Sequence, residues 1–313
     1  MIVDRNIRFG RLVAIIWKRV VLMTVVSSLI VAVIAWLDLS KVVPDITAPL
    51  ILGTALAIFL GFRTDTANER WFGARRMFYT LAAQSRTLGL VVAQSLARHA
   101  RDDTPSLRPQ DRAAMERLVR LSMAHAWCLG RQLKGHDPLV HPDVLNLLTE
   151  AERDALSRSH NPALAIVFDQ TQALGRLTDT GALTDPEADE LADILREVAR
   201  VQTEAEGLRD TPFPVHYSIF THVFIWLLVV LLSLSLPAKE QLAVYAVPLA
   251  VLIGWIFSMI EGIGSYMEEP WADNRNVVPT DAIARNLERD LRALTLGETD
   301  LPDALTPEGG ALY

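Results

Sequence analysis

Four long runs without a charged residue constrain the fold of this 313-residue chain more than any other feature. They cover residues 20–37, 46–62, 211–238 and 242–260, and none contains Asp, Glu, Lys or Arg. A helix needs about 20 residues to cross the roughly 30 Å hydrocarbon core of a bilayer, and each run is close to or above that length. Half of all residues are hydrophobic, which is high for a soluble chain of this size. The runs therefore predict four membrane-spanning helices.

Basic residues predict how these helices are oriented. The bases before the first run are Arg5, Arg8, Arg11, Lys18 and Arg19. The short loop after that run, 38–45, carries Lys41 as its base. Because basic loops favour the cytoplasmic side of a membrane, the N-terminus is expected in the cytoplasm. The runs then form two hairpins, and the regions 63–210 and 263–313 are expected to be cytoplasmic.

The region between the hairpins is predicted to be helical. Residues 111–134 and 184–208 carry apolar side chains at helical spacing, and Asp185-Pro186 followed by acids is typical of a helix start. Loops are expected at 135–142, 159–162 and 178–181. A last helix is expected after 279, with Thr280 as its cap and an apolar face formed by Ile283, Leu287, Leu291 and Leu294. No segment shows the alternation of a strand, so the predicted class is all-α.

Residues for catalysis or metal binding are hard to find. The chain has no phosphate-binding glycine loop, no Gly-x-Ser-x-Gly and a single cysteine, Cys128, expected to be a buried apolar side chain. His216 and His222 stand six residues apart, so they do not share one helical face and no metal site is expected. His216 is expected at the membrane interface, and His222 is expected to form a hydrogen bond within the bundle. The net charge of −7 argues against a nucleic-acid partner. We therefore expect neither an enzyme nor a cofactor.

The second apolar run carries two lines of residues, each with one member per helical turn. Gly53, Ala57 and Gly61 form a small-residue line that would let another helix approach closely. Thr54, Ile58 and Phe62 form a second line, which we call the neck stripe. If several copies of this helix surrounded an axis, the stripe would become stacked rings, and a narrow apolar ring stops ions because they lose their hydration shell there. The alternative is ordinary packing of an aliphatic stripe in a membrane bundle.

Charges return abruptly after the second run. Arg63, Asp65, Glu69 and Arg70 follow Phe62 within eight residues. Asp65, Glu69 and Arg70 stand at four- and five-residue intervals, so they can pair along a continuing helix. The sequence therefore predicts one long helix that leaves the membrane at Arg63, with Asp65, Glu69 and Arg70 paired along it.

Three segments resemble the bestrophin family. The first is GTALAIFLGFRTDTANERWFGARR, which contains the family's arginine-aromatic run as Arg70-Trp71. The second is TPFPVHYSIFTHVFIW, similar to the family's proline-containing entry to its third membrane segment, with Pro214 here. The third is EEPWADNRNVVPTDAIARNLERDLRAL, which resembles the stretch after the last membrane segment. The segments occur in the family's order and cover most of the chain up to about residue 297.

The resemblance implies a homopentameric ion channel in the bacterial inner membrane, with one central pore and both termini in the cytoplasm. Its neck would be lined by rings of Thr54, Ile58 and Phe62, the stripe that the spacing also shows. A second, cytosolic constriction would fall at Pro186 or Glu187. The expected partners are further copies of the chain, the bilayer and monovalent ions.

The resemblance also bears on calcium gating and on the charge of the conducted ion. Calcium-gated relatives bind the ion with an acidic cluster after the last membrane segment, and the equivalent region here retains Glu268, Glu269 and Asp273. Asn274 and Val277 replace acids, and Asn276 is likewise uncharged, so this set is poorer in carboxylates than calcium prefers. We expect no calcium gating. The family name implies chloride, but a negative cytoplasmic region, including a Glu187 ring, would favour sodium.

Two further functions remain open from the sequence. The large helical region could belong to a membrane-anchored enzyme or receptor, which would require a cleft with converging titratable groups. It could also be an interaction scaffold that the two hairpins merely anchor, in which case the protein would be monomeric in detergent.

Overall fold

The computed structural model describes residues 9–38, 43–100, 107–238, 243–272 and 277–307, and within these ranges it contains helices and no strand. Contacts between Cα atoms divide the chain into two compact units. We call residues 4–71 together with 212–269 the apolar unit, and the unit that contains 72–211 and the residues from 270 onward the helical unit. The all-α prediction is confirmed for the described residues.

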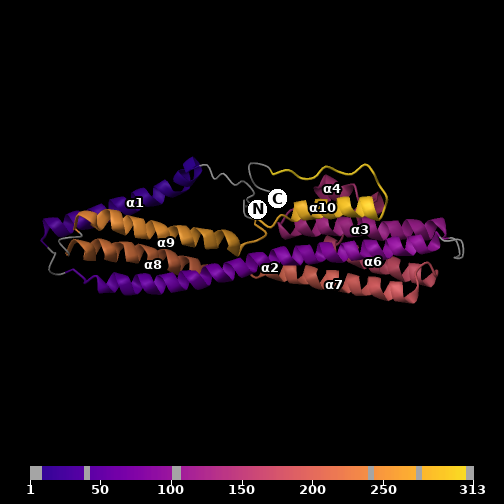
Figure 1. Ribbon diagram of the computed structural model, residues 1–313, viewed down its shortest axis with the longest axis horizontal. Coiled ribbons are helices and arrows are strands. Elements are labelled where there is room, and N and C mark those ends of the chain that lie inside the picture. The colour runs from indigo at the N-terminus through magenta and orange to yellow at the C-terminus, as the bar shows by residue number, and fades with distance from the viewer. Residues whose placement is uncertain (1–8, 39–42, 101–106, 239–242, 273–276, 308–313) are drawn as a thin grey trace. The chain divides into compact units, whose positions relative to one another are not determined.

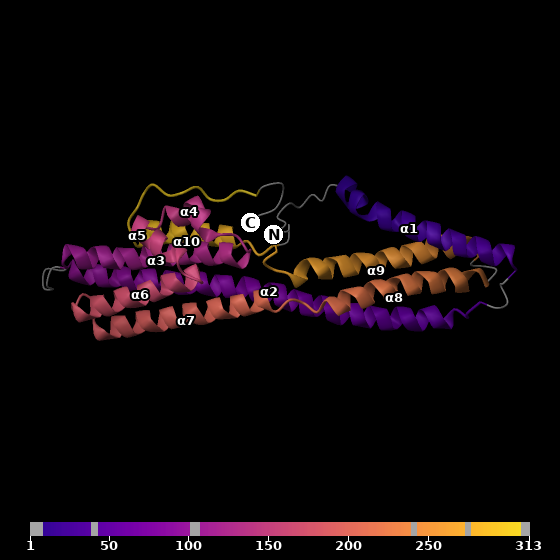
Figure 2. The ribbon, with the colours of Figure 1, turned by 180° about the vertical axis from the view of Figure 1, so that it is seen from behind.

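The apolar unit packs four helices around one core. They are α1 (Phe9–Trp36), the first part of α2 (Thr47–His99), α8 (Val215–Ser235) and α9 (Ala246–Glu268), with short 3₁₀ turns η3 (Leu236–Ala238) and η4 (Ala243–Tyr245) between the last two. Figures 1 and 2 show α8 and α9 side by side. The core consists mainly of aliphatic side chains, among them Met23, Leu56, Leu60, Leu228 and Val229. By length and composition all four helices could cross a membrane, as predicted for the four runs.

The helix ends differ from the predicted runs for physical reasons. The second run does not end at 62, since α2 continues unbroken for 53 residues. Helix α8 begins at Val215 rather than 211, because Pro214 precedes it as the N-cap with extended backbone. Helix α9 continues past 260 to Glu268, since Glu261 forms ion pairs inside the unit and does not need to leave it.

Exposed aromatic residues mark both ends of the apolar unit. Trp17 and Trp36 lie on α1 and are 50% and 84% exposed. Tyr245 precedes α9 and Tyr266 lies in its last turns, and both are more than half exposed. At 1.5 Å per residue, the members of each pair are about 30 Å apart along their helix. Aromatic residues at this separation are typical of the two interfaces of a bilayer.

The helical unit surrounds α3 (Pro109–Leu133). Helices α6 (Pro162–Asp179), α7 (Asp185–Asp210) and α10 (Thr280–Leu294) pack against α3 (Figure 2), and the second part of α2 also belongs to the unit. Short elements η2 (Pro138–Val140), α4 (Pro142–Leu145) and α5 (Glu150–Ser157) follow α3. The apolar face predicted for 111–134 is buried, as Met115, Leu118 and Trp127 show. Of the predicted loops, 135–142 contains η2 and the first residue of α4, and 178–181 begins inside α6, which ends at Asp179. Gly135 and Gly181 have positive φ angles, which favour glycine.

The start of α10 differs from the prediction. Thr280 is the first helical residue rather than the cap, which is Pro279, and the Thr280 hydroxyl donates to Asp281. The reason is packing: Thr280 is fully buried, and its side chain lies 3.1 Å from where a Cβ on Gly130 of α3 would be. The apolar face of α10 is buried except at its end, where Leu294 is 78% exposed.

The predicted small-residue line on α2 does not mediate close packing within the chain. A Cβ on Gly61 would meet nothing within 4 Å, and one on Gly53 would make only ordinary contact with Leu228. The close approach in this unit occurs at Gly254 of α9, where an added Cβ would overlap Val229 and lie 3.2 Å from the sulfur of Met23. Gly254 therefore lets α1, α8 and α9 share one core.

Replacing this glycine should destabilise the apolar unit. Val229 is β-branched and fully buried, so it cannot move aside easily, and we expect Gly254→Ala to lower the free energy of unfolding by about 1–3 kcal/mol. Gly262→Ala on the same helix is the control, because its new methyl would meet nothing within 4 Å. Thermal unfolding in detergent measures both variants, and equal melting temperatures would contradict the packing described here.

Candidate functional site

The neck stripe lies on the face of α2 that points away from the core. Ile58 and Phe62 are 57% and 71% exposed, and Thr54 is exposed as well. Leu56 and Leu60, on the opposite face, are 2% and 1% exposed. Packing within the chain therefore does not explain why large apolar residues stand at positions 58 and 62.

The stripe offers no free hydrogen-bond donor. Its one polar member, Thr54, donates its hydroxyl proton to the Leu50 carbonyl oxygen, 2.9 Å away in the preceding turn. Thr66, one turn after Phe62 along the chain, donates to the Phe62 carbonyl oxygen in the same way at 3.0 Å. An anion passing the stripe would find no hydroxyl proton to replace its hydration shell.

The neck stripe is the first part of a longer exposed line along α2. Beyond Phe62, residues at alternating steps of three and four are exposed: Asp65, Glu69, Phe72, Arg76, Tyr79 and Ala83. This spacing averages 3.5 residues and keeps one line on nearly the same side of a helix for many turns. Asp65 and Glu69 therefore share the face of Ile58 and Phe62 and come directly after them.

Asp65, Glu69 and Arg70 do not pair with one another as predicted. Within the described part of the chain, Asp65 and Glu69 have no hydrogen bond or ion pair, and both are exposed. Arg63 and Arg70 instead reach into the bundle toward the end of α9. The helix thus separates its charges by face, with acids on the exposed line and arginines on the packed side.

Arg63 is the centre of a buried ionic cluster. Its side chain is 2% exposed, and its Nε donates to Glu268 Oε1 at 2.7 Å. Its Nη1 donates to the Thr221 hydroxyl at 3.2 Å and lies 3.5 Å from Glu261 Oε1, and its Nη2 donates to Ser265 at 3.2 Å. These contacts join α2 to α8 and α9 one residue after Phe62. The fourth charge-free run ends before Glu261, so that run did not identify this acid, although an acid bordering an apolar run indicates a buried base nearby.

The other residues expected from the family motifs support the same corner of the apolar unit. Arg70 Nε donates to the Glu268 backbone oxygen at 2.8 Å, which satisfies a carbonyl at the end of α9. Trp71 is 6% exposed, and Pro214 caps α8. These three side chains have structural roles in this unit.

The expected cytosolic constriction falls at the start of α7. Glu187 closes a capping box: its carboxylate accepts from the Thr184 N–H at 2.8 Å and also binds Arg98 Nη2 at 2.9 Å. Burial alone would raise the pKa of Glu187, but the hydrogen bonds from Thr184 and Arg98 together lower it. Pro186 is exposed and has no such role in the cap. The Glu187 carboxylate is therefore ionised, and its hydrogen bonds hold it at the start of α7.

The stretch after α9, where calcium-gated relatives are expected to bind the ion, is described only in part. Asp273, Asn274 and Asn276 lie outside the described residues, while Glu269 is exposed. The Glu268 carboxylate is bound by Arg63, so it is not free to contribute to an ion site. Elsewhere in the described ranges, no group of three or more His, Cys, Asp or Glu is arranged to hold a metal.

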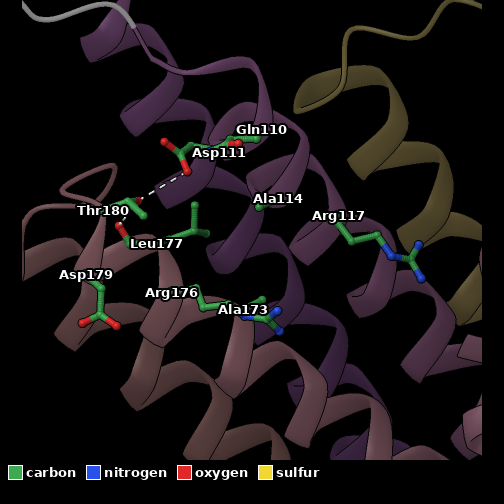
Figure 3. Close-up of a pocket in the computed structure, with 9 residues that line it drawn as sticks. All are labelled: Gln110, Asp111, Ala114, Arg117, Ala173, Arg176, Leu177, Asp179 and Thr180. Carbon is green, nitrogen blue, oxygen red and sulfur yellow. Dashed lines mark hydrogen bonds between the residues drawn. The ribbon is translucent and has the colours of Figure 1, made fainter.

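A cavity of about 480 Å³ lies between α3 and α6 in the helical unit (Figure 3). Its lining contains no histidine, cysteine or serine, and Thr180 donates to Asp111 across it. Arg117 points away from Asp111 in Figure 3 and forms hydrogen bonds with Glu152. Asp111, Arg117 and Thr180 are hydrogen-bonded to neighbours, and the described lining does not hold the nucleophile and base that an acyl-transfer enzyme would need.

Cys128, His125 and His222 are buried or hydrogen-bonded to neighbouring residues. Cys128 is buried, and burial raises its pKa to about 12, so the thiol is unreactive as expected. His125 is buried in the helical unit, where burial lowers its pKa and Nε2 lies 2.9 Å from the Gln202 amide oxygen. His222 forms the predicted hydrogen bond within its bundle, with Nδ1 at 2.9 Å from the Ser218 oxygen.

Comparison with known proteins gives one consistent result. The family model described as "Bacterial/Fungal Bestrophin protein" matches residues 5–293. A protein of Salmonella typhi named voltage-dependent anion channel-forming protein YneE is 26% identical over 96% of this chain and 92% of its own length. The protein of that name from Escherichia coli K12 is 28% identical over 82% of this chain and 79% of its own. A solved bacterial bestrophin homologue from Klebsiella pneumoniae has 26% identity, a TM-score of 0.80 and covers 91% of this chain and 100% of its own.

The buried cluster makes a sharp prediction for Arg63. Replacing it by Gln leaves Glu261 and Glu268 without their main positive partner, which should lower the free energy of unfolding by about 3–5 kcal/mol. Arg19→Gln is the control: Arg19 is 52% exposed and 3.6 Å from Glu261, so its loss should cost under about 1 kcal/mol. Thermal unfolding in detergent tests both, and a wild-type melting temperature for Arg63→Gln would refute the role given to this cluster.

Proposed function

Because the chain belongs to the bacterial and fungal bestrophin family, we propose that it is a membrane ion channel that conducts small monovalent ions. The single observation that carries the proposal is the neck stripe: large apolar side chains stand exposed at one-turn spacing on a helix apolar enough to span a membrane. The names of the Salmonella and Escherichia relatives, anion channel-forming proteins, support conduction as the activity.

The channel would be a homopentamer with α2 of each copy around a central axis. In that arrangement Thr54, Ile58 and Phe62 become three stacked rings. The rings of Ile58 and Phe62 are purely apolar, and the Thr54 hydroxyl proton is already donated to the Leu50 carbonyl oxygen. A narrow ring of this kind empties of water, and an ion then meets a barrier because nothing replaces its hydration shell. The neck would thus be a hydrophobic gate.

A second constriction is proposed at Pro186 rather than Glu187. The reason is the capping box, which holds the Glu187 carboxylate against Thr184 and Arg98, while Pro186 is exposed beside it. A ring of Pro186 would be rigid and uncharged. On this assignment, Glu187 contributes little to the choice of ion.

We place the protein in the bacterial inner membrane with both termini in the cytoplasm, as the basic residues before α1 suggest. Calcium is not part of the proposal, because Glu268 is taken by Arg63 and uncharged residues stand in the equivalent acidic stretch. No catalytic step is proposed.

Two ion classes remain candidates. The names of the relatives favour anions. A specific feature of this chain favours cations: Asp65 and Glu69 directly follow the neck on the exposed line of α2, whereas Arg63 and Arg70 are turned into the bundle. In a pentamer the two acids would form two negative rings at the inner mouth of the neck, which would raise the local concentration of cations.

Enlarging the neck should increase conduction. Ile58→Ala and Phe62→Ala remove exposed apolar bulk and should raise the single-channel current or open probability several-fold in planar bilayers. Ile219→Ala is the matched control, since Ile219 is similarly exposed, at 54%, but lies on α8. Equal currents in all four proteins would contradict the neck. A monomeric protein without current would instead favour the scaffold.

Reversal potentials decide the charge of the ion. With asymmetric sodium chloride across a bilayer, the reversal potential of a cation-selective wild type should lie near that of sodium. In Asp65→Asn, Glu69→Gln and the double variant it should shift toward that of chloride, because each variant loses negative charge at the neck. Glu150→Gln, an exposed acid on α5, is the control and should leave the potential unchanged. A wild-type potential near that of chloride, unaffected by these variants, would establish the anion candidate.

A further inference from the structure

The exposed line of α2 changes the sign of its charge along the helix. After the neck stripe it begins with the acids Asp65 and Glu69. From Arg70 to His99, the last residue of α2, the sequence contains no Asp or Glu but five arginines. One of these arginines, Arg76, is on the exposed line. The line therefore carries negative charge first and positive charge later.

Arg76 differs from the other four arginines of this stretch in its lack of a partner. The other four contact neighbouring groups: Arg70 the Glu268 carbonyl oxygen at 2.8 Å, Arg75 the face of the Tyr79 ring, Arg86 the Asp290 carboxylate at 2.6 Å and Arg98 the Glu187 carboxylate at 2.9 Å. Within the described ranges, Arg76 is exposed and has no hydrogen bond, ion pair or ring contact. The fold of a single chain thus gives no role to a positive charge at position 76.

Large aromatic side chains flank Arg76 on the same line. Phe72 comes one turn earlier and is 52% exposed, and Tyr79 comes one turn later and is 47% exposed. Rings of this size displace water beside the guanidinium, and a charge acts more strongly on an ion where less water separates them. The Arg75 guanidinium lies 5.4 Å from the centroid of the Tyr79 ring, which places a second positive charge next to the line. These surroundings attract an anion and repel a cation.

We propose that Arg76 is a selectivity residue that attracts permeating anions to the part of the pore beyond the neck. This role rests on the proposed channel function. Arg76 follows Phe62 by fourteen residues, or two heptads, on one unbroken helix, so helical register keeps the two residues on nearly the same side of α2. In the pentamer the copies of Arg76 would form a positive ring, and their guanidinium N–H groups would replace part of the hydration shell of a chloride ion.

The positive ring and the two acidic rings act on different ions. Glu69 and Arg76 are seven residues apart, which is about 10 Å along a helix and similar to the Debye length in about 0.1 M salt. Each ring therefore controls mainly the ion concentration in its own section of the path. Positive charge at Arg76 offsets part of the barrier that Asp65 and Glu69 present to an anion. Arg76 thereby raises the share of the current that chloride carries.

The first experiment measures how permeability depends on the charge at position 76. From reversal potentials in sodium chloride near 0.1 M, the chloride-to-sodium permeability ratio of Arg76→Gln should be at least about threefold below that of the wild type. Arg76→Lys keeps the charge and should keep the ratio. The difference should shrink in about 1 M salt, where screening is stronger. Arg176→Gln is the matched control, because Arg176 is an exposed arginine of α6 and its loss should leave the ratio unchanged. A wild-type ratio in Arg76→Gln would overturn the role of Arg76.

The second experiment changes the charge on a working channel. The native cysteine, Cys128, is buried and its pKa is raised to about 12, so Arg76→Cys supplies the thiol that reacts. A methanethiosulfonate reagent with a trimethylammonium group should restore the chloride-to-sodium ratio, and one with a sulfonate group should lower it further. Arg176→Cys, treated in the same way, should not respond. Equal ratios after both reagents on Arg76→Cys in a conducting protein would refute the role of Arg76 alone. A wild type that carries no current would refute the channel and this role together.

Discussion

The buried guanidinium of Arg63 is the interaction on which the apolar unit depends. A charge can be enclosed in an apolar bundle only if its partners offset the loss of water, and Arg63 has two carboxylates and two hydroxyls within reach. These partners come from α8 and α9, about 160 to 200 residues later in the chain. The cluster therefore fixes the position of α2 at the residue where the neck stripe ends.

Fixing one face of α2 leaves the other face available for function. The packed face carries Leu56, Leu60 and the two arginines, and the exposed face carries Ile58, Phe62 and then acids. One helix thereby carries an exposed apolar stripe followed by exposed acids, without a break at Arg63. The 3.5-residue spacing of the exposed line keeps these different surfaces aligned along the helix.

Local sequence rules predicted much of the helical unit. Helices α3 and α7 lie where their apolar spacing and the Asp185-Pro186 start place them, because both signals act within a few turns. Thr280 was wrong as a cap because burial against Gly130 on another helix governs it. Glu187 is a similar case: the sequence places it at a helix start, but its second partner, Arg98, comes from α2.

The sequence by itself determined the four apolar helices, the all-α class and the register of Thr54, Ile58 and Phe62. Hydropathy and helical periodicity are properties of consecutive residues, so they can be read without the fold. Only the tertiary structure decided that Arg63 binds Glu261 and Glu268, that Asp65 and Glu69 have no partner among the described residues, and that Gly254 is a point of close packing. Ion pairs and close contacts depend on which distant residues come within a few ångströms, and spacing along the chain does not contain that information.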